Sequence, residues 1–78
     1  VQQGKAEEAI QHFKKALAIT PDFAEAHNNL AGAFVRQGKL KEAVEHYNQA
    51  LDLEPNYAQT KRNLALVLEK QKRLPNEV

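Results

Sequence analysis

The sequence predicts an all-α fold in which antiparallel helical hairpins stack into an α-α solenoid of about four helices. The chain repeats itself: when residues 1–34 are laid over residues 35–68, 14 of the 34 pairs are identical. Apolar residues recur at helical spacing along each segment, and no segment alternates in the two-residue period of a β-strand. A repeat of about 20–50 residues is typical of a unit that buries its apolar face only against its own copies.

The first helix is predicted over residues 5–19, where apolar residues fall on a single stripe. The stripe consists of Ala6, Ala9, Ile10, Phe13, Ala16 and Leu17. Pro21 ends this helix because proline has no amide to donate and disfavours helical geometry at the preceding residue. Gly4 and Gly38 occupy equivalent positions 34 residues apart, and each is expected to mark the end of a helix.

A second helix is predicted over residues 23–37. Asp22 can act as its N-cap by accepting a hydrogen bond from a free backbone amide, and Glu25 stands three residues later in the reciprocal position. Gly38 follows the helix, and glycine accepts the left-handed backbone conformation that closes a helix.

A third helix is predicted over residues 40–53 and a fourth from residue 57 to about residue 70. The stripe of the third helix consists of Leu40, Ala43, Val44, Tyr47, Ala50 and Leu51. Pro55 separates the two helices, and Asn56 with Gln59 repeats the predicted capping pattern. Alanines recur where two helices must approach closely, and aromatic residues and leucines fill the space between them. Each 34-residue unit is therefore predicted to be a helical hairpin.

Composition limits the chain to one small domain. It has 78 residues and no cysteine, which excludes disulfides and thiolate metal sites, and no stretch approaches the roughly 20 apolar residues that span a bilayer. The net charge is +1, although residues 58–78 carry five basic and two acidic groups. Short basic runs such as Lys70, Lys72 and Arg73 are mostly solvated helix faces, so neither nucleic acid nor a membrane is expected as a partner. The compartment is left open, with a slight preference for the cytoplasm.

The sequence predicts a protein that is not an enzyme and uses no cofactor. It contains no serine or cysteine that could act as a nucleophile, and it has no glycine-rich phosphate loop. No two of His12, His27 and His46 stand three or four residues apart, the spacing at which one helix presents two ligands to a metal. Structural roles are therefore expected for these histidines, and no metal site is predicted.

Residues 24–57 resemble one tetratricopeptide repeat. The positions that carry the resemblance are Leu30, Ala31, Phe34, Gly38, Ala43, Tyr47, Ala50 and Pro55, and only His27 departs clearly from the family pattern. The resemblance divides the single domain 1–78 into a half repeat 1–23, a full repeat 24–57 and a partial repeat 58–78. This register predicts that the chain begins and ends in the middle of a hairpin, so that helices 5–19 and 57–70 each present an unpartnered apolar face.

The resemblance implies a scaffold that binds a protein or peptide. In the family, the first helix of each hairpin lines a concave groove that holds an extended peptide or a partner helix. That face corresponds here to Glu25, Asn28, Asn29, Gly32, Val35, Arg36, Gln59, Arg62, Asn63, Leu66, Glu69 and Lys70. Asn29 and Asn63 are equivalent, and a row of amides can bind a peptide backbone without requiring a particular sequence. An equally weighted interpretation is that asparagine is simply a frequent hydrogen-bonded residue of the family at this position.

Other readings remain open at this stage. The chain could be the substrate-recognition arm of a larger enzyme such as a glycosyltransferase. It could also be a self-assembly element that forms homo-oligomers when the fourth helix of one copy pairs with the first helix of the next. Within the groove, Arg36, Arg62 and Lys70 would favour an acidic ligand. Gln59 and Asn63 stand where the clamp for a C-terminal carboxylate found in this family requires basic residues, which makes that clamp doubtful.

Overall fold

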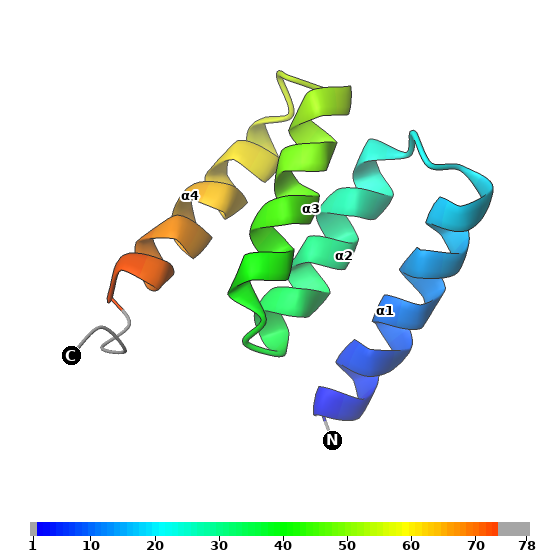
Figure 1. The fold of residues 1–78 in the computed structure, drawn as a ribbon, viewed down its shortest axis with the longest axis horizontal. Coiled ribbons are helices and arrows are strands. Elements are labelled where there is room, and N and C mark those ends of the chain that lie inside the picture. Colours follow the sequence, from blue (N-terminus) through cyan, green and yellow to red (C-terminus); the bar gives the residue numbers. More distant parts are fainter. Residues whose placement is uncertain (1, 74–78) are drawn as a thin grey trace.

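In the computed structural model, residues 2–73 are described, with side chains from residue 4 onward. Four α-helices follow one another: α1 (Gln2–Ile19), α2 (Ala24–Arg36), α3 (Leu40–Leu53) and α4 (Ala58–Arg73). Short turns at alternating ends make consecutive helices antiparallel (Figure 1). The predicted all-α fold is confirmed, and residues 2–73 contain no β-strand. The last five residues of the predicted partial repeat 58–78, and residue 1, lie outside this described range.

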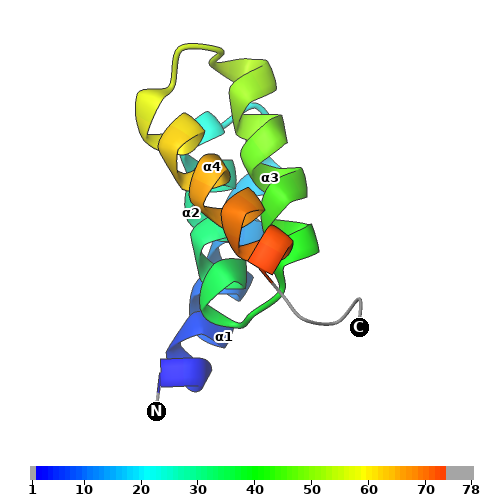
Figure 2. The same cartoon turned by 90° about the vertical axis from the view of Figure 1, so that its left-hand side faces the viewer.

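The helices form a thin stack centred on α2. The Cα atoms fit within 42 × 33 × 16 Å, and the view from the α4 side shows the helices lying one behind another (Figure 2). Among the described helices, α2 contacts all three others, whereas α1 contacts α2 alone and α4 contacts α3 and α2. No described helix is both long and apolar enough to cross a membrane.

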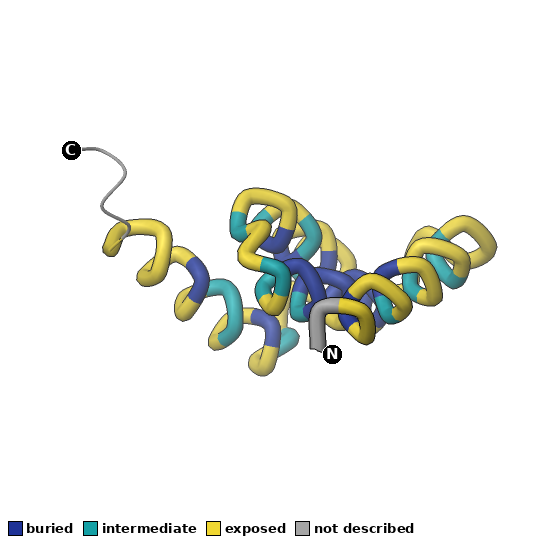
Figure 3. Tube along the Cα trace, turned by 90° about the horizontal axis from the view of Figure 1, so that it is seen from below, coloured by how far each residue is buried: buried dark blue, intermediate teal, exposed yellow. Residues whose placement is uncertain are grey.

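The core lies mainly between α2 and α3. Its buried residues are Ile10, Leu30, Ala31, Ala33, Phe34, Ala43, Tyr47 and Val67. Figure 3 shows buried positions gathered along α2 and the facing side of α3, while most of α1 and α4 is exposed. The alanines predicted to allow close helix approach behave differently along the stack. Ala31, Ala43 and Ala50 are fully buried, Ala9 and Ala16 are half-buried, and Ala65 on α4 is exposed.

Gly38 closes α2 as the sequence predicts. Its φ angle of +77° lies in the left-handed region. The amide of Gly38 donates to the carbonyl of Val35 at 2.9 Å, and the amide of Lys39 donates to that of Phe34 at 2.9 Å. These two bonds form a Schellman motif, which satisfies carbonyls that the end of a helix leaves free.

Two local predictions about helix ends are wrong. Gly4 does not end a helix but lies inside α1, and unlike Gly38 it does not have a left-handed backbone conformation. Asp22 does not cap α2: Phe23 occupies the N-cap position in an extended conformation, no side chain caps the helix, and the amide of His27 donates to the Phe23 carbonyl.

The N-cap residue predicted for α4 also lies one residue too far from its helix. This helix begins at Ala58, and the Lys61 amide donates to the carbonyl of Tyr57, which leaves Asn56 one residue too early. Both predicted caps therefore fail by one residue, because an aromatic residue takes the place between each capping candidate and its helix.

A pair of glycine substitutions tests these backbone assignments. Gly38→Ala should lower the free energy of unfolding by about 1–2 kcal/mol, since an L-residue is disfavoured at a left-handed φ. Gly4→Ala should be neutral or stabilising by up to about 1 kcal/mol, because alanine is preferred inside a helix. Neither new methyl group would meet a heavy atom within 4 Å, so steric effects do not obscure the comparison. Urea unfolding measures both, and equal effects would contradict the assignment of Gly38.

Candidate functional site

Five of the predicted groove residues line one hollow formed by α2, α3 and α4. This hollow, called the α4 hollow below, has a volume of about 410 Å³. The five are Val35, Asn63, Leu66, Glu69 and Lys70, and the lining is completed by Tyr47, Val67 and Arg73. The face predicted from the first helix of each hairpin is thus partly gathered into a single concave surface.

The apolar part of the α4 hollow comes from Val35, Leu66 and Val67, and Tyr47 adds a ring with a hydroxyl. Tyr47 and Val67 are buried, while Leu66 is 62% exposed. A Cβ atom added at Gly32 would lie 3.9 Å from the Tyr47 hydroxyl, which places this predicted groove residue beside the same group. Burial raises the pKa of Tyr47, an effect that the nearby positive charge of Arg36 opposes. The hydroxyl therefore stays protonated near neutral pH and can both donate and accept a hydrogen bond.

The rim of the α4 hollow carries a net positive charge. Glu69 and Arg73 approach to 3.4 Å one helical turn apart, but both side chains are more than half exposed, so the pair adds little to stability. Lys70 lines the same hollow and makes no ion pair among the described residues. Two cations and one carboxylate leave the rim favourable to an acidic group.

Asn28 does not lie in the groove, contrary to the sequence prediction. It is buried, and its Oδ1 accepts a hydrogen bond of 2.7 Å from the Oγ1 of Thr60. This bond joins α2 to α4. The side chain is therefore occupied in positioning the two helices, because a buried polar group requires a partner.

The remaining predicted residues are exposed but do not line the α4 hollow. These are Glu25, Asn29, Arg36, Gln59 and Arg62. Sequence analysis missed Tyr47, Val67 and Arg73 as site residues, because it assigned Tyr47 only to the buried stripe of its helix. A signal was present: Phe13 occupies the equivalent position one period earlier, and the change from phenylalanine to tyrosine adds the hydroxyl that reaches the hollow.

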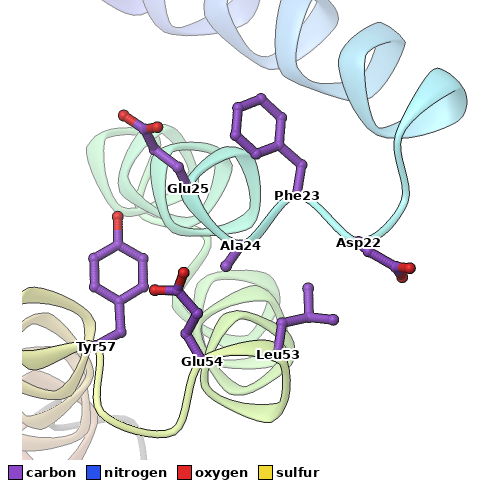
Figure 4. Close-up of a pocket in the computed structure, with 7 residues that line it drawn as sticks. All are labelled: Asp22, Phe23, Ala24, Glu25, Leu53, Glu54 and Tyr57. Atoms are coloured by element: carbon purple, nitrogen blue, oxygen red, sulfur yellow. The ribbon is translucent and has the colours of Figure 1, made fainter.

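A second hollow lies at the end of the stack that carries the α1–α2 and α3–α4 turns. It measures about 640 Å³ and is lined by Asp22, Phe23, Ala24, Glu25, Leu53, Glu54 and Tyr57. Figure 4 shows the carboxylates of Glu25 and Glu54 on the same side as the Tyr57 ring, while Asp22 points away. Burial raises the pKa of Tyr57, and both carboxylates raise it further. The two hollows thus differ in the sign of their charge.

Two histidines come together across α2 and α3. The Nδ1 atoms of His27 and His46 lie 3.2 Å apart, and Nε2 of His27 lies 3.1 Å from the carbonyl oxygen of Pro21. The sequence did not reveal this pair, because its members are 19 residues apart on different helices. The described residues contain no group of three or more histidine, cysteine or acidic side chains that could hold a metal ion.

Comparison with known proteins gives a match to a family. The model described as TPR repeat matches residues 1–38 and again residues 31–72. The curated proteins contain no match to this chain.

The buried hydrogen bond between Thr60 and Asn28 predicts what happens when the donor, Thr60, is replaced. Thr60 is fully buried, and Thr60→Val should lower the free energy of unfolding by about 1–3 kcal/mol because the Asn28 oxygen is left buried without a partner. Thr20→Val is the matched control: Thr20 is exposed, and its replacement should change stability by less than about 0.5 kcal/mol.

A second substitution separates the hydrogen bond from other effects of the valine. Adding Asn28→Leu to Thr60→Val should recover part of the loss, because no buried polar atom then lacks a partner. Denaturant unfolding of the single and double variants measures this recovery. Purely additive losses would show that the bond does not position α4.

Proposed function

This chain belongs to the TPR repeat family, and on that premise we propose that it is a binding module that holds an extended segment of a protein partner in the α4 hollow. TPR repeats generally mediate interactions between proteins and are not typically catalytic. The observation that carries the proposal is the exposed Leu66 beside the buried Val67 and Tyr47, within a concave surface that has polar groups at its edge.

Leu66 supplies the apolar part of the proposed interaction. Full burial of a leucine side chain contributes about 1.5–3 kcal/mol, and Leu66 is 62% exposed, so most of that free energy is available to a ligand. The buried side chains of Tyr47 and Val67 line the same hollow. An apolar side chain of the partner is the group that fits between them.

The polar part comes from Asn63, Lys70 and the Tyr47 hydroxyl. The half-buried amide of Asn63 can donate to and accept from a peptide backbone. Lys70 favours a carboxylate on the ligand, and the exposed Arg36 and Arg62 extend the positive charge along α2 and α4. Asn29 is proposed to continue the row of amides on α2. The preferred ligand is therefore an extended segment with an apolar residue close to an acidic one.

A recognition arm of a larger enzyme, such as a glycosyltransferase, would use the same surface. Sequencing of the coding region on either side of this segment tests that alternative, because it requires an adjoining catalytic domain.

Selection from a displayed peptide library tests the proposed ligand preference. Enriched peptides should combine an apolar with an acidic residue, and calorimetry should show that Leu66→Ser weakens binding of the selected peptide about tenfold or more, because apolar contact area is lost. Lys70→Glu should weaken the same peptide and reduce the dependence of its affinity on salt.

Two neighbouring residues of α4 provide controls. Leu68→Ser removes an exposed leucine outside the hollow, and Lys72→Glu makes the same charge reversal outside it. Both should leave affinity nearly unchanged. Equal losses at Leu66 and Leu68, or no enrichment at all, would count against the α4 hollow as the binding surface.

Self-assembly is a second candidate, favoured by a comparison between equivalent positions. On α2, Ala31 is 0% and Phe34 7% exposed, because α3 covers them. On α4, the equivalent Ala65 is exposed and Leu68 is 45% exposed. The face that α2 buries against α3 is thus open on α4.

The matching open face is on α1. Helix α1 repeats the sequence of α3, with Phe13 in place of Tyr47, yet Phe13 is half-buried whereas Tyr47 is buried. We propose that α1 of a second copy covers α4, so that copies join head to tail.

Light scattering over a roughly hundredfold concentration range tests this assembly, because association rises with concentration. The mass should rise above that of the 8.8 kDa protomer, and Leu68→Lys should keep the chain monomeric because it places a charge on the contact face. Leu66→Lys, on the hollow side of the same helix, should not affect the mass. A constant protomer mass for the unmodified chain would reject head-to-tail assembly.

A further inference from the structure

Two imidazole rings meet where α2, α3 and the α1–α2 turn come together. His27 is buried, and its two ring nitrogens contact different elements: Nδ1 lies 3.2 Å from Nδ1 of His46 on α3, and Nε2 lies 3.1 Å from the Pro21 carbonyl in the turn. His46 is half-buried, and its ring also packs near that of Phe34, with centroids 5.6 Å apart. One side chain therefore connects a turn to two helices.

The positions of the protons follow from the partners. A carbonyl oxygen only accepts, so Nε2 of His27 must carry a hydrogen. A neutral imidazole has one N–H, which leaves Nδ1 of His27 as an acceptor, and Nδ1–H of His46 as the donor to it. The bond between the rings thus requires that one of the two facing Nδ1 atoms carry no hydrogen, so at least one of the two rings must be neutral.

We propose that His27 and His46 form a pH-sensitive latch, closed at neutral pH, that holds the α1–α2 turn against the α2–α3 hairpin. A proton can enter at Nε2 of His46 without breaking the bond between the rings, because Nδ1–H of His46 continues to donate. When both rings are protonated, two N–H groups face each other 3.2 Å apart and the latch opens. This proposal does not depend on the function proposed for the α4 hollow.

The surroundings of His46 oppose its protonation. Burial lowers its pKa most, and the neighbouring His27 lowers it further; Lys14 of α1 acts in the same direction, while Glu45 and Gln49 on its own helix oppose the shift. Among the described residues, α4 contributes no group to this balance. Asp52 lines a hollow of about 340 Å³ together with Pro21 and His27, so this hollow reaches the His27 side of the pair.

The direction of the pH effect follows. Because the pKa of His46 is lower in the folded chain than its ordinary value of 6.5, the folded state binds fewer protons there than the unfolded state. The stabilisation is fully present above the ordinary pKa and is lost as the pH falls below it toward the lowered pKa.

Repulsion between the two charged rings would move the His27 ring away from α3, and with it the turn that its Nε2 holds through the Pro21 carbonyl and that carries Asp22 and Phe23. Both residues line the acidic hollow, and the same turn leads into α1, which contacts α2 alone among the described helices. The fully buried alanines between α2 and α3 do not depend on the latch. Mild acid is therefore expected to loosen α1 while the α2–α3 hairpin stays folded.

Nitrogen NMR on the unmodified chain tests the latch directly. At about pH 8, His27 should show the tautomer with hydrogen on Nε2, and a coupling between the two Nδ1 nuclei should report the hydrogen bond between the rings; this coupling should vanish near pH 5. The amide of Thr20, which donates to Ala16 at the end of α1, should exchange with solvent faster near pH 5, after correction for the intrinsic rate. A His27 tautomer with hydrogen on Nδ1, or a coupling that persists near pH 5, would overturn the proposal.

Histidines at equivalent positions supply a matched comparison. His46→Phe removes the donor, and the fall in Tm between about pH 8 and pH 5 should become smaller than in the unmodified chain. His12→Phe alters the exposed equivalent one period earlier and should leave the full fall in place. Equal pH dependence in the unmodified chain and His46→Phe would contradict the latch. If His46→Phe does not fold, the NMR measurement decides alone.

Discussion

The packing of α2 against α3 is the constraint on which the rest of the structure depends. It requires alanine where the two backbones approach, and Ala31, Ala43 and Ala50 are all fully buried. Any larger side chain there would separate the helices, since protein interiors have no spare volume. Because α2 also contacts α1 and α4, its position relative to α3 determines where both outer helices lie, and hence the shape of the α4 hollow.

Side-chain hydrogen bonds connect the same helices and fix how each one is aligned along its neighbour. Among the described residues, α2 and its C-cap residue Gln37 make one side-chain hydrogen bond to each neighbouring helix: Gln37 donates to Glu7 of α1, His27 pairs with His46 of α3, and Asn28 accepts from Thr60 of α4. A buried polar group that loses its partner is costly, so these bonds select one register for each helix pair. The Gln37 contact is exposed and contributes least. The other two lie within the stack, where water competes less.

Equivalent residues acquire different roles because the repeat is used in different surroundings. Phe34 and Leu68 occupy the same repeat position, yet Phe34 is buried on α2 and Leu68 is 45% exposed on α4. Gly32 and Leu66 are also equivalent, and only Leu66 brings an apolar side chain to the α4 hollow. A solenoid thus obtains core, end surface and binding surface from one pattern. What a position does depends on which neighbour lies beside it.

The sequence by itself determined the four helices, the turns at Pro21 and Pro55 and the closure at Gly38, because these follow from local periodicity and from backbone restrictions that act within a few residues. It also indicated Val35, Asn63, Leu66, Glu69 and Lys70, since repeat register places them on one face. It could not show that Asn28 turns inward to Thr60, that Tyr47 reaches the hollow, or that His27 meets His46. Those contacts join residues 12 or more positions apart on different helices. They depend on the distances and rotations between packed helices, which only the tertiary structure decided.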